Sequence, residues 1–225
     1  RANEQGIKIV TNNSTIEDDS IISSYVESNQ HKIAKKCGEA AANYIRDELG
    51  GKAKVAILAY KSQIPEQSDI RTNGFKEQIA DMEGVEIVAE QDAWLAEMSV
   101  RKTGDILTAN PDVNVIYCAN EGGAIGAVMA VKNEGKVGEV GVFGIGASPQ
   151  MVDFLLSDDN IMQAIVGQDA FNIGSMAVEA CVKAVKGEEV ESRQEAGNIF
   201  LSRDDPEKVR EFKVDLEELI SKGNK

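Results

Sequence analysis

An alternation of short apolar runs with helix-like segments is the feature that most restricts how this chain folds. Runs that are apolar throughout, without polar alternation, predict strands buried on both faces of a sheet. Strands that alternate with helices join as right-handed parallel units. We therefore predict a doubly wound α/β fold with a parallel sheet. The expected strands lie at residues 55–60, 85–89, 113–118, 140–143 and 161–166, and the expected helices at 70–82, 99–108, 122–134, 149–156 and 171–186.

The two ends of the chain carry weaker signals. Residues 1–6 resemble the last turn of a helix closed by a glycine, and Ile7–Val10 is a strand-like run. Because proteins rarely begin with the tail of a helix, we expect further residues upstream, a leader peptide among them. The charge-rich tail after Asp204 predicts a short helix at 216–221. The first strand and the 171–186 helix bracket the five-strand layer and indicate a second lobe.

Composition excludes several classes of partner. The chain has 225 residues, a net charge of -14 and an isoelectric point near 4.6. Nucleic acid needs Lys and Arg to neutralise its phosphates, so we expect no nucleic-acid partner. An anionic membrane surface is unfavourable for the same reason. No apolar run approaches the roughly 20 residues of a membrane span.

Reactive side chains are sparse. Cys37, Cys118 and Cys181 are far apart, and His31 is the only histidine. No His/Cys metal cluster and no histidine-based catalytic triad can be assembled from this set within one chain. Adjacent carboxylates predict solvated turns rather than an acid/base pair. We therefore expect no catalytic residues, no metal site, no cofactor and no enzyme activity.

Two glycine-rich stretches follow predicted strands and precede predicted helices. The stretch at 121–126 lacks the dinucleotide spacing G-x-G-x-x-G. The stretch at 144–148 has no Walker lysine, and it is either a plain tight turn or an anion cradle at a helix start. In either case Ser148 is the expected cap of the 149–156 helix, with Pro149 at the first helical position.

Four polar or aromatic residues fall where a doubly wound sheet binds ligands, beyond the carboxyl ends of its strands. Trp94 follows a strand and either packs in the core or stacks on a ligand. Arg71 lies near a helix start and is either a solvated surface residue or a fork-shaped donor to ligand oxygens. Asn120 and Gln168 each end an apolar strand, and their amides suit a polyol or neighbouring loops.

The order and spacing of several short motifs carry a resemblance that no one of them carries alone. Over almost all of its length, the chain resembles the sugar-type periplasmic binding proteins of the type I fold, the ribose-binding class. The motifs are Gln5–Thr11, Arg71–Phe75, Thr108–Val113, Ala119–Glu121, Val142–Gly144 and Ala164–Asp169.

The resemblance implies two lobes joined by three crossings, in a chain that is N-terminally truncated. Residues 30–167 plus about 198–225 would form the C-terminal lobe. Residues 1–29 plus 168–197 would be a remnant of the N-terminal lobe. Carried over by position, the ligand-binding residues would be Asn13, Arg71, Trp94, Asn120 and Gln168, with Glu121 and Gly146 as further candidates.

Two positions depart from the pattern of this class. Asn13 and Gly146 stand where sugar binders commonly place aspartates that accept hydrogen bonds from sugar hydroxyls. Their loss makes the expected pocket less negative while Arg71 remains. We hypothesise that the ligand is a sugar acid or a sugar phosphate, an inference that Glu121 opposes if it faces the pocket.

The function implied is solute binding for an ABC-type uptake system, with a sugar or sugar-like molecule held in the cleft between the lobes. A membrane permease is the expected partner. The expected location is the periplasm or, as a lipoprotein, the cell surface, after export by a signal peptide. The alternative is an effector-sensing domain of a sugar-responsive transcription regulator or sensor kinase. A leader upstream would favour the first, and a basic helix-turn-helix the second. An incomplete first lobe would weaken binding and promote self-association.

Overall fold

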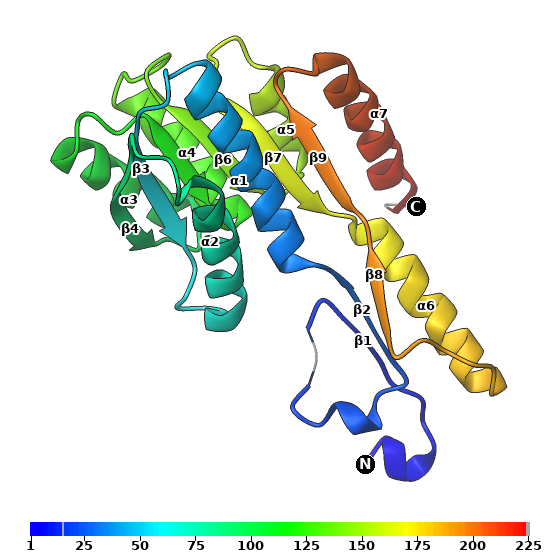
Figure 1. Ribbon diagram of the computed structural model, residues 1–225. Coiled ribbons are helices and arrows are strands. Elements are labelled where there is room, and N and C mark those ends of the chain that lie inside the picture. The colour runs from blue at the N-terminus through cyan, green and yellow to red at the C-terminus, as the bar shows by residue number, and fades with distance from the viewer. Residues whose placement is uncertain (15, 224–225) are drawn as a thin grey trace. The chain divides into compact units, whose positions relative to one another are not determined.

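The computed structural model describes residues 1–14 and 16–223, and the chain divides into two compact units (Figure 1). Unit 1 comprises residues 1–29 and 168–199, and unit 2 comprises residues 30–167 and 200–225. The identification of these units with the two lobes implied by the resemblance remains a proposal. None of the helices described has the length and apolar content needed to cross a bilayer.

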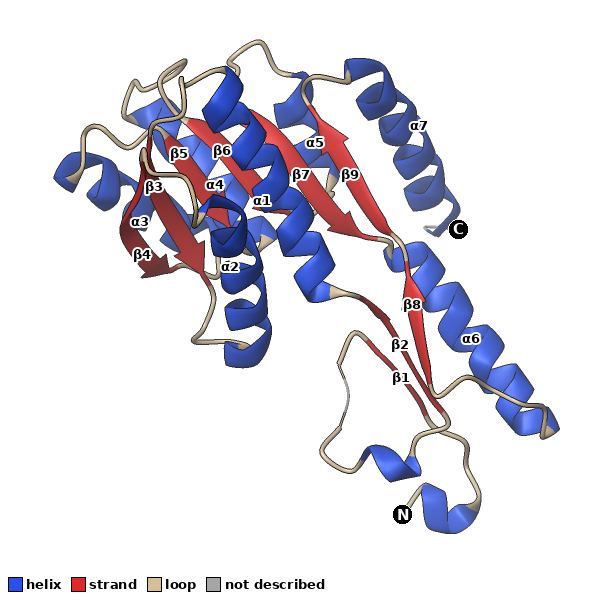
Figure 2. Cartoon of the chain, in the orientation of Figure 1, coloured by secondary structure: helices blue, strands red, loops and turns tan. Residues whose placement is uncertain are grey.

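Unit 2 is built on a six-stranded sheet of order β4-β3-β5-β6-β7-β9. From β3 the chain winds to β4 on one side and to β5, β6 and β7 on the other, and these five strands are all parallel. Strand β9 runs opposite to β7 at the edge (Figure 2). The prediction of a doubly wound parallel sheet is confirmed. The bounds are β3 Ala53–Ala59, β4 Val85–Asp92, β5 Val115–Cys118, β6 Gly141–Ile145, β7 Met162–Gln168 and β9 Asn198–Ser202.

Helices cover both faces of this sheet, which explains the continuous apolar runs. Every residue of β5 and β6 is buried, whereas every residue of the edge strand β4 is exposed or half-buried. Helices α1 and α2 pack together on one face, and α3, α4 and α5 lie on the other (Figure 1). The bounds are α1 Gln30–Asp47, α2 Pro65–Ile79, α3 Ala96–Ala109, α4 Glu121–Asn133, α5 Pro149–Leu156 and α7 Pro206–Gly223.

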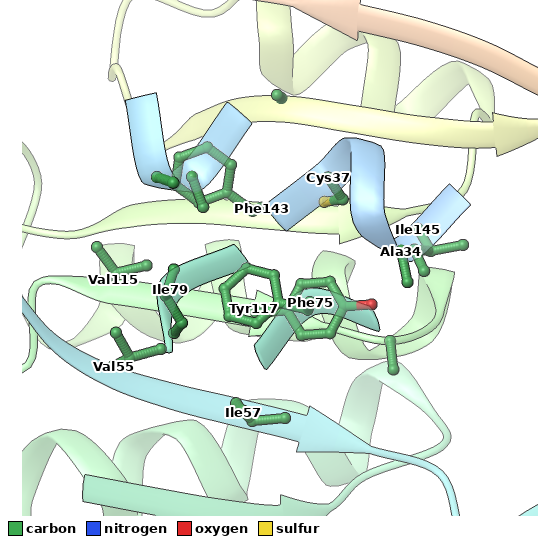
Figure 3. Close-up of a cluster of buried hydrophobic side chains, with 14 of the residues drawn as sticks. Ala34, Cys37, Val55, Ile57, Phe75, Ile79, Val115, Tyr117, Phe143 and Ile145 are labelled. Atoms are coloured by element: carbon green, nitrogen blue, oxygen red, sulfur yellow. The ribbon is translucent and has the colours of Figure 1, made fainter. Parts of the chain in front are cut away.

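The main core fills the layer between the sheet and the α1–α2 pair (Figure 3). The Phe75 ring from α2 stacks on the Tyr117 ring from β5, with centroids 4.0 Å apart and planes 9° apart. Tyr44 meets Phe143 edge to face at 5.6 Å. The Cys37 thiol lies within the same layer, 3.7 Å from the Gly144 carbonyl oxygen, and burial raises its pKa.

Unit 1 contains a three-stranded parallel sheet of order β1-β2-β8, on which helix α6 packs. Its core is small and consists of Val26, Ile173 and Ala196, with partly buried residues around them. The outward side of α6 leaves Phe171, Val178 and Val185 largely exposed, at 64%, 64% and 75%. The bounds are η1 Asn3–Gln5, β1 Val10–Asn12, η2 Asp19–Ile21, β2 Ser24–Ser28, α6 Ala170–Lys186 and β8 Arg193–Ala196.

Several predicted boundaries are wrong for identifiable reasons. The first strand is Val10–Asn12 rather than 7–10, because only that segment pairs with β2, although Gly6 does close a helical turn in the left-handed conformation. Helix α2 begins at Pro65, five residues before the predicted start, because proline fits a first helical position. The expected helix at 216–221 is the end of the longer α7.

Five of the described elements, α1, β2, β8, β9 and the short η2, have no counterpart in the prediction. The buried residues of α1, among them Ile33, Cys37, Ala41 and Ile45, recur at helical spacing, so the sequence does carry the pattern of this helix although the prediction missed it. Strand β8 is polar and mostly exposed, which removes the usual strand signal.

Candidate functional site

The carboxyl ends of β3 and β5 mark the place where the sheet of unit 2 reverses its winding. At such a point the two following loops leave toward opposite faces of the sheet, and a binding crevice forms between them. Five predicted residues of unit 2 and one unpredicted residue gather near the ends of β3, β4, β5 and β6. We call this group the carboxyl-edge cluster: Tyr60, Arg71, Trp94, Asn120, Glu121 and Gly146.

Arg71 lies on α2 and is tied to the end of β5. Its Nε donates to Gln30 Oε1 at 2.9 Å, and its Nη1 donates to the carbonyl oxygen of Ala119 at 2.8 Å. Only 6% of the residue is exposed, so it is not a solvated surface arginine. The neighbouring Asp69 pairs instead with Lys61, at 2.8 Å.

The buried Arg71 guanidinium has no anionic partner in the part of the chain that the structure describes. A guanidinium has five N–H donors, and only two of those on Arg71 have acceptors among the described residues. Burial lowers the pKa of Arg71, because charge is disfavoured away from water. A buried cation with spare donors is a ready-made site for ligand oxygens.

An aromatic pair extends the cluster from Arg71 toward the end of β4. Tyr60 follows β3, its ring centroid lies 5.6 Å from that of Trp94, and the Arg71 guanidinium carbon lies 5.5 Å from the Tyr60 centroid. The Tyr60 hydroxyl donates to Gln67 Oε1 at 2.7 Å, and burial raises its pKa to about 12. Trp94 is half-buried, packs on the core and keeps part of its surface accessible. Both readings of Trp94 therefore stay open.

Asn120 has structural partners at both ends of its amide. Its Oδ1 accepts the backbone N–H of Gly123 at 3.3 Å and so caps helix α4. Its Nδ2 donates to the carbonyl oxygen of Trp94 at 2.8 Å. The side chain thus fixes the loop that carries Trp94, and any contact with a ligand would use its remaining N–H and lone pair.

The glycines after Asn120 allow close helix packing. A Cβ at Gly122 would lie 2.4 Å from the Trp94 carbonyl oxygen, and one at Gly126 would lie 2.3 Å from the Ala96 carbonyl oxygen. These distances are shorter than any normal contact, so α4 approaches the Trp94 loop and α3 only through glycine. Close packing accounts for the glycine-rich stretch at 121–126 without a phosphate.

Glu121 and Gly146 meet across the ends of β5 and β6. Gly146 has φ +149°, and a Cβ added there would lie 2.7 Å from Met151 Sδ and 3.1 Å from Glu121 Oε2. Glu121 is exposed at the first position of α4, and its carboxylate has no ion pair or hydrogen bond among the described residues. The next turn begins at Ser148, which occupies the cap position of α5 but makes no side-chain cap bond.

The other two predicted residues, Asn13 and Gln168, lie in unit 1 and contact each other. Gln168 Nε2 donates to Asn13 Oδ1 at 2.9 Å. Asn13 has φ +52°, in the left-handed region that asparagine tolerates, and its N–H donates to the Val26 carbonyl oxygen at 2.9 Å. Residues 155 positions apart in the sequence thus form one amide pair.

Two partners of Arg71 were not predicted from the sequence. Tyr60 has a usable signal, since it is the aromatic last residue of the β3 apolar run. Gln30 has none, because it reaches Arg71 from 41 positions away. Within residues 1–14 and 16–223, no three His, Cys, Asp or Glu side chains form a group fit to hold a metal.

Unit 2 also has a pocket of about 820 Å³ that contains none of the predicted residues. It lies beside α1 and the β7–β9 edge, and its lining includes Tyr44, Gln163, Phe200 and Arg203.

Comparison with known proteins relates this arrangement to one family. The family model described as "Periplasmic binding protein domain" matches residues 1–189. The ABC transporter periplasmic-binding protein YphF of Escherichia coli K12 is 26% identical over 189 residues, which is 82% of this chain and 57% of that protein. The D-allose-binding periplasmic protein of the same organism is 32% identical over 155 residues, 68% of this chain and 49% of that protein.

A solved structure shows the same fold. The periplasmic solute-binding protein of an Actinobacillus succinogenes ABC transporter, with bound D-allose, superimposes with a TM-score of 0.83 and 27% identity, covering 93% of this chain and 72% of that one. The chain spans about half the length of the curated relatives that it matches. It belongs to the periplasmic binding protein family, and its α/β architecture is that family's type I fold.

Proposed function

We propose that this chain is part of the solute-binding component of an ABC-type uptake system, and that its carboxyl-edge cluster binds a sugar or sugar-like molecule. The observation that carries the proposal is the buried guanidinium of Arg71, which has unused donors and no anionic partner among the described residues. The cluster combines hydrogen-bond donors, a carboxylate acceptor and an aromatic face, which suits the binding of a hydroxyl-rich molecule.

A sugar matches the chemistry of the cluster. Adjacent oxygens on a pyranose or furanose accept from the planar fork of a guanidinium, in the way that carboxylate oxygens do. The half-buried Trp94 offers a rigid apolar face for the C–H surface of a sugar ring. For the Asn13–Gln168 amide pair of unit 1 we propose the same role, since amides both donate to and accept from hydroxyls.

The transport context is a further part of the proposal. One relative and one solved structure are named as periplasmic binding proteins of ABC transporters, which supports export to the periplasm and a membrane permease as partner. A signal peptide and a lipid anchor are included in the proposal. Fractionation of the native organism, with mass spectrometry of the mature N-terminus, tests them. Recovery of the protein in the cytoplasm with an intact start would contradict export.

Binding is best tested through Trp94, the sole tryptophan of the chain. Its fluorescence is titrated with D-allose, D-ribose, D-gluconate and ribose 5-phosphate, in the 225-residue chain and in the complete product of its gene. We expect a saturable change with at least one of these ligands in the complete product. The absence of a saturable change with every ligand, together with no heat in calorimetry, would contradict sugar binding.

Variants of Arg71 locate the site. Arg71→Lys keeps the charge but loses the planar fork, so we expect binding to weaken by about 10- to 100-fold, the worth of a hydrogen bond to a charged group. The matched control is Arg101→Lys, on the exposed surface of α3 in the same unit. Equal affinity of both variants would place the ligand away from Arg71.

A further inference from the structure

We propose that Glu121 is the residue that determines ligand charge at this site, and that it selects a neutral, hydroxyl-rich ligand over a sugar acid or a sugar phosphate. This inference rests on the proposed function and assigns a ligand class to the same cluster. It follows from the way in which Glu121, Gly146 and Arg71 are arranged in unit 2.

The Glu121 carboxylate fills the space that a side chain at position 146 would occupy. Its Oε2 lies 3.1 Å from where a Cβ on residue 146 would be, and its own Cβ lies 3.0 Å from the same point. Gly146 follows β6, and Glu121 opens the helix that follows β5, so both lie at the carboxyl edge of adjacent parallel strands. The absence of a side chain at 146 therefore does not leave this edge without a carboxylate.

Glycine at 146 is strongly favoured by this arrangement. The backbone there has φ +149°, which L side chains rarely adopt, and Met151 Sδ blocks the same space at 2.7 Å. Any larger residue would displace either the Met151 side chain or the Glu121 carboxylate. The carboxylate at this edge therefore comes from the start of α4 and not from the residue after β6, and the missing side chain of Gly146 leaves room for it.

The charges on this edge complement a neutral polyol. Arg71 offers N–H donors and lacks an anionic partner, and Glu121 offers acceptor oxygens and lacks a cationic partner among residues 1–14 and 16–223. Within the described residues, the two side chains form no ion pair with each other. A molecule rich in hydroxyl groups both accepts from the guanidinium and donates to the carboxylate. An added anionic group would meet like charge at Glu121.

Helix electrostatics offer a plain alternative for Glu121. A carboxylate in the first turn of a helix is stabilised by the helix dipole without any ligand. Glu207 has the same residue type in the first turn of α7 and is equally exposed. Helix α7 starts near Arg203, whose Nε donates to the Met162 carbonyl oxygen at the start of β7, so Glu207 lies at the opposite edge of the sheet. It is therefore a matched control.

The test compares Glu121→Gln with Glu207→Gln in the complete gene product, using Trp94 fluorescence and calorimetry with D-allose, D-ribose, D-gluconate and ribose 5-phosphate. We expect the unmodified protein to prefer the neutral sugars. Glu121→Gln should weaken the neutral sugars by about tenfold or more and improve the acidic ligands relative to them, because Arg71 is then the only charged member of the carboxyl-edge cluster. Glu207→Gln should leave all four affinities unchanged. Thermal unfolding measures the helix-dipole contribution, which both variants share.

The outcomes separate this inference from the proposed function. Binding of neutral sugars that is equal in Glu121→Gln and the unmodified protein would overturn the role of Glu121 but leave sugar binding intact. A preference for D-gluconate or ribose 5-phosphate in the unmodified protein would overturn the neutral ligand class in the same way. No saturable binding of any of the four would overturn both. If Glu121→Gln fails to fold, Glu121→Asp, which retracts the carboxylate by one methylene, is used for the same comparison.

Discussion

Both units pair most of their strands in parallel, but they bury their sheets very differently. In unit 2 helices cover both faces, and strands β5 and β6 are buried along their whole length. In unit 1 the face under α6 has a small apolar core, while Tyr25, Glu27 and Arg193 form a polar network beside it. The difference teaches that parallel pairing sets the topology, whereas the number of covered faces decides how much apolar area contributes to stability.

The largest effect should come from the stacked aromatic pair in unit 2. Phe75→Ala removes a fully buried ring that lies 4.0 Å from the Tyr117 ring, and we expect a loss of about 3–5 kcal/mol in the free energy of unfolding. Val26→Ala, in the small core of unit 1, should cost less, because fewer buried neighbours surround it. Urea unfolding followed by circular dichroism measures both. A larger loss for Val26→Ala would reverse the comparison.

The next largest difference in unfolding free energy should appear between two side-chain helix caps, one in each unit. Asn120 caps α4 in unit 2 and also bonds to the Trp94 carbonyl, whereas Asp169 caps α6 in unit 1 through the Asn172 N–H at 3.2 Å. We expect Asn120→Ala to cost about 2 kcal/mol and Asp169→Ala about 1 kcal/mol. The emission of Trp94 should shift only in Asn120→Ala. Equal costs and no shift would mean that the bond to the Trp94 loop contributes nothing.

The parts of the fold that could be predicted are those whose side chains carry the pattern by themselves. Strands β3, β5, β6 and β7 are nearly continuous apolar runs, so burial on both faces was readable in the sequence. Helix α1 carries a comparable pattern, since Ile33, Cys37, Ala41 and Ile45 recur at helical spacing, and it could have been predicted although it was missed. Strand β8 escaped because Arg193 and Glu195 are exposed and it is held by backbone pairing with β2, which no local pattern records.

The candidate site likewise has a part that could be predicted from the sequence and a part that could not. Topology alone predicted that Trp94 and Asn120 lie at the carboxyl edge of the sheet. It did not predict that the Asn120 amide accepts from the Gly123 N–H and donates to the Trp94 carbonyl oxygen. Those two hydrogen bonds depend on the packing of α4 against the β4–α3 loop. The position of Glu121 beside Gly146 likewise depends on the distance between two neighbouring helix starts, which sequence spacing does not encode.

A smaller effect, with a defined dependence on pH, is expected at Asp159 in unit 2. Burial raises the pKa of this carboxyl, but hydrogen bonds from Lys132, Ser157 and the Ile161 N–H outweigh it, so the pKa is lowered overall. The stability from these bonds is present above the ordinary aspartate pKa of about 4 and is lost as the pH falls through the lowered folded-state value. Urea midpoints of Asp159→Asn should therefore approach those of the unmodified chain at low pH. Asp81→Asn, at an exposed position, is the control; an unchanged gap at every pH would contradict the expectation.

The smallest effect on stability should come from the exposed side of α6 in unit 1. Val178 and Val182 lie one helical turn apart and are largely exposed, so replacing both by Ser removes little buried area and should change the free energy of unfolding by less than about 0.5 kcal/mol. An exposed apolar stripe on a helix does favour association. We therefore propose that the chain self-associates through this stripe and that the double variant lowers the sedimentation coefficient toward that of a monomer. Val214→Ser on α7 of unit 2 removes an equally exposed but separate valine and should leave association unchanged. If Val214→Ser lowers the sedimentation coefficient and the α6 double variant does not, the contacts between copies lie on unit 2. The exposed apolar side of α6 then has no part in self-association.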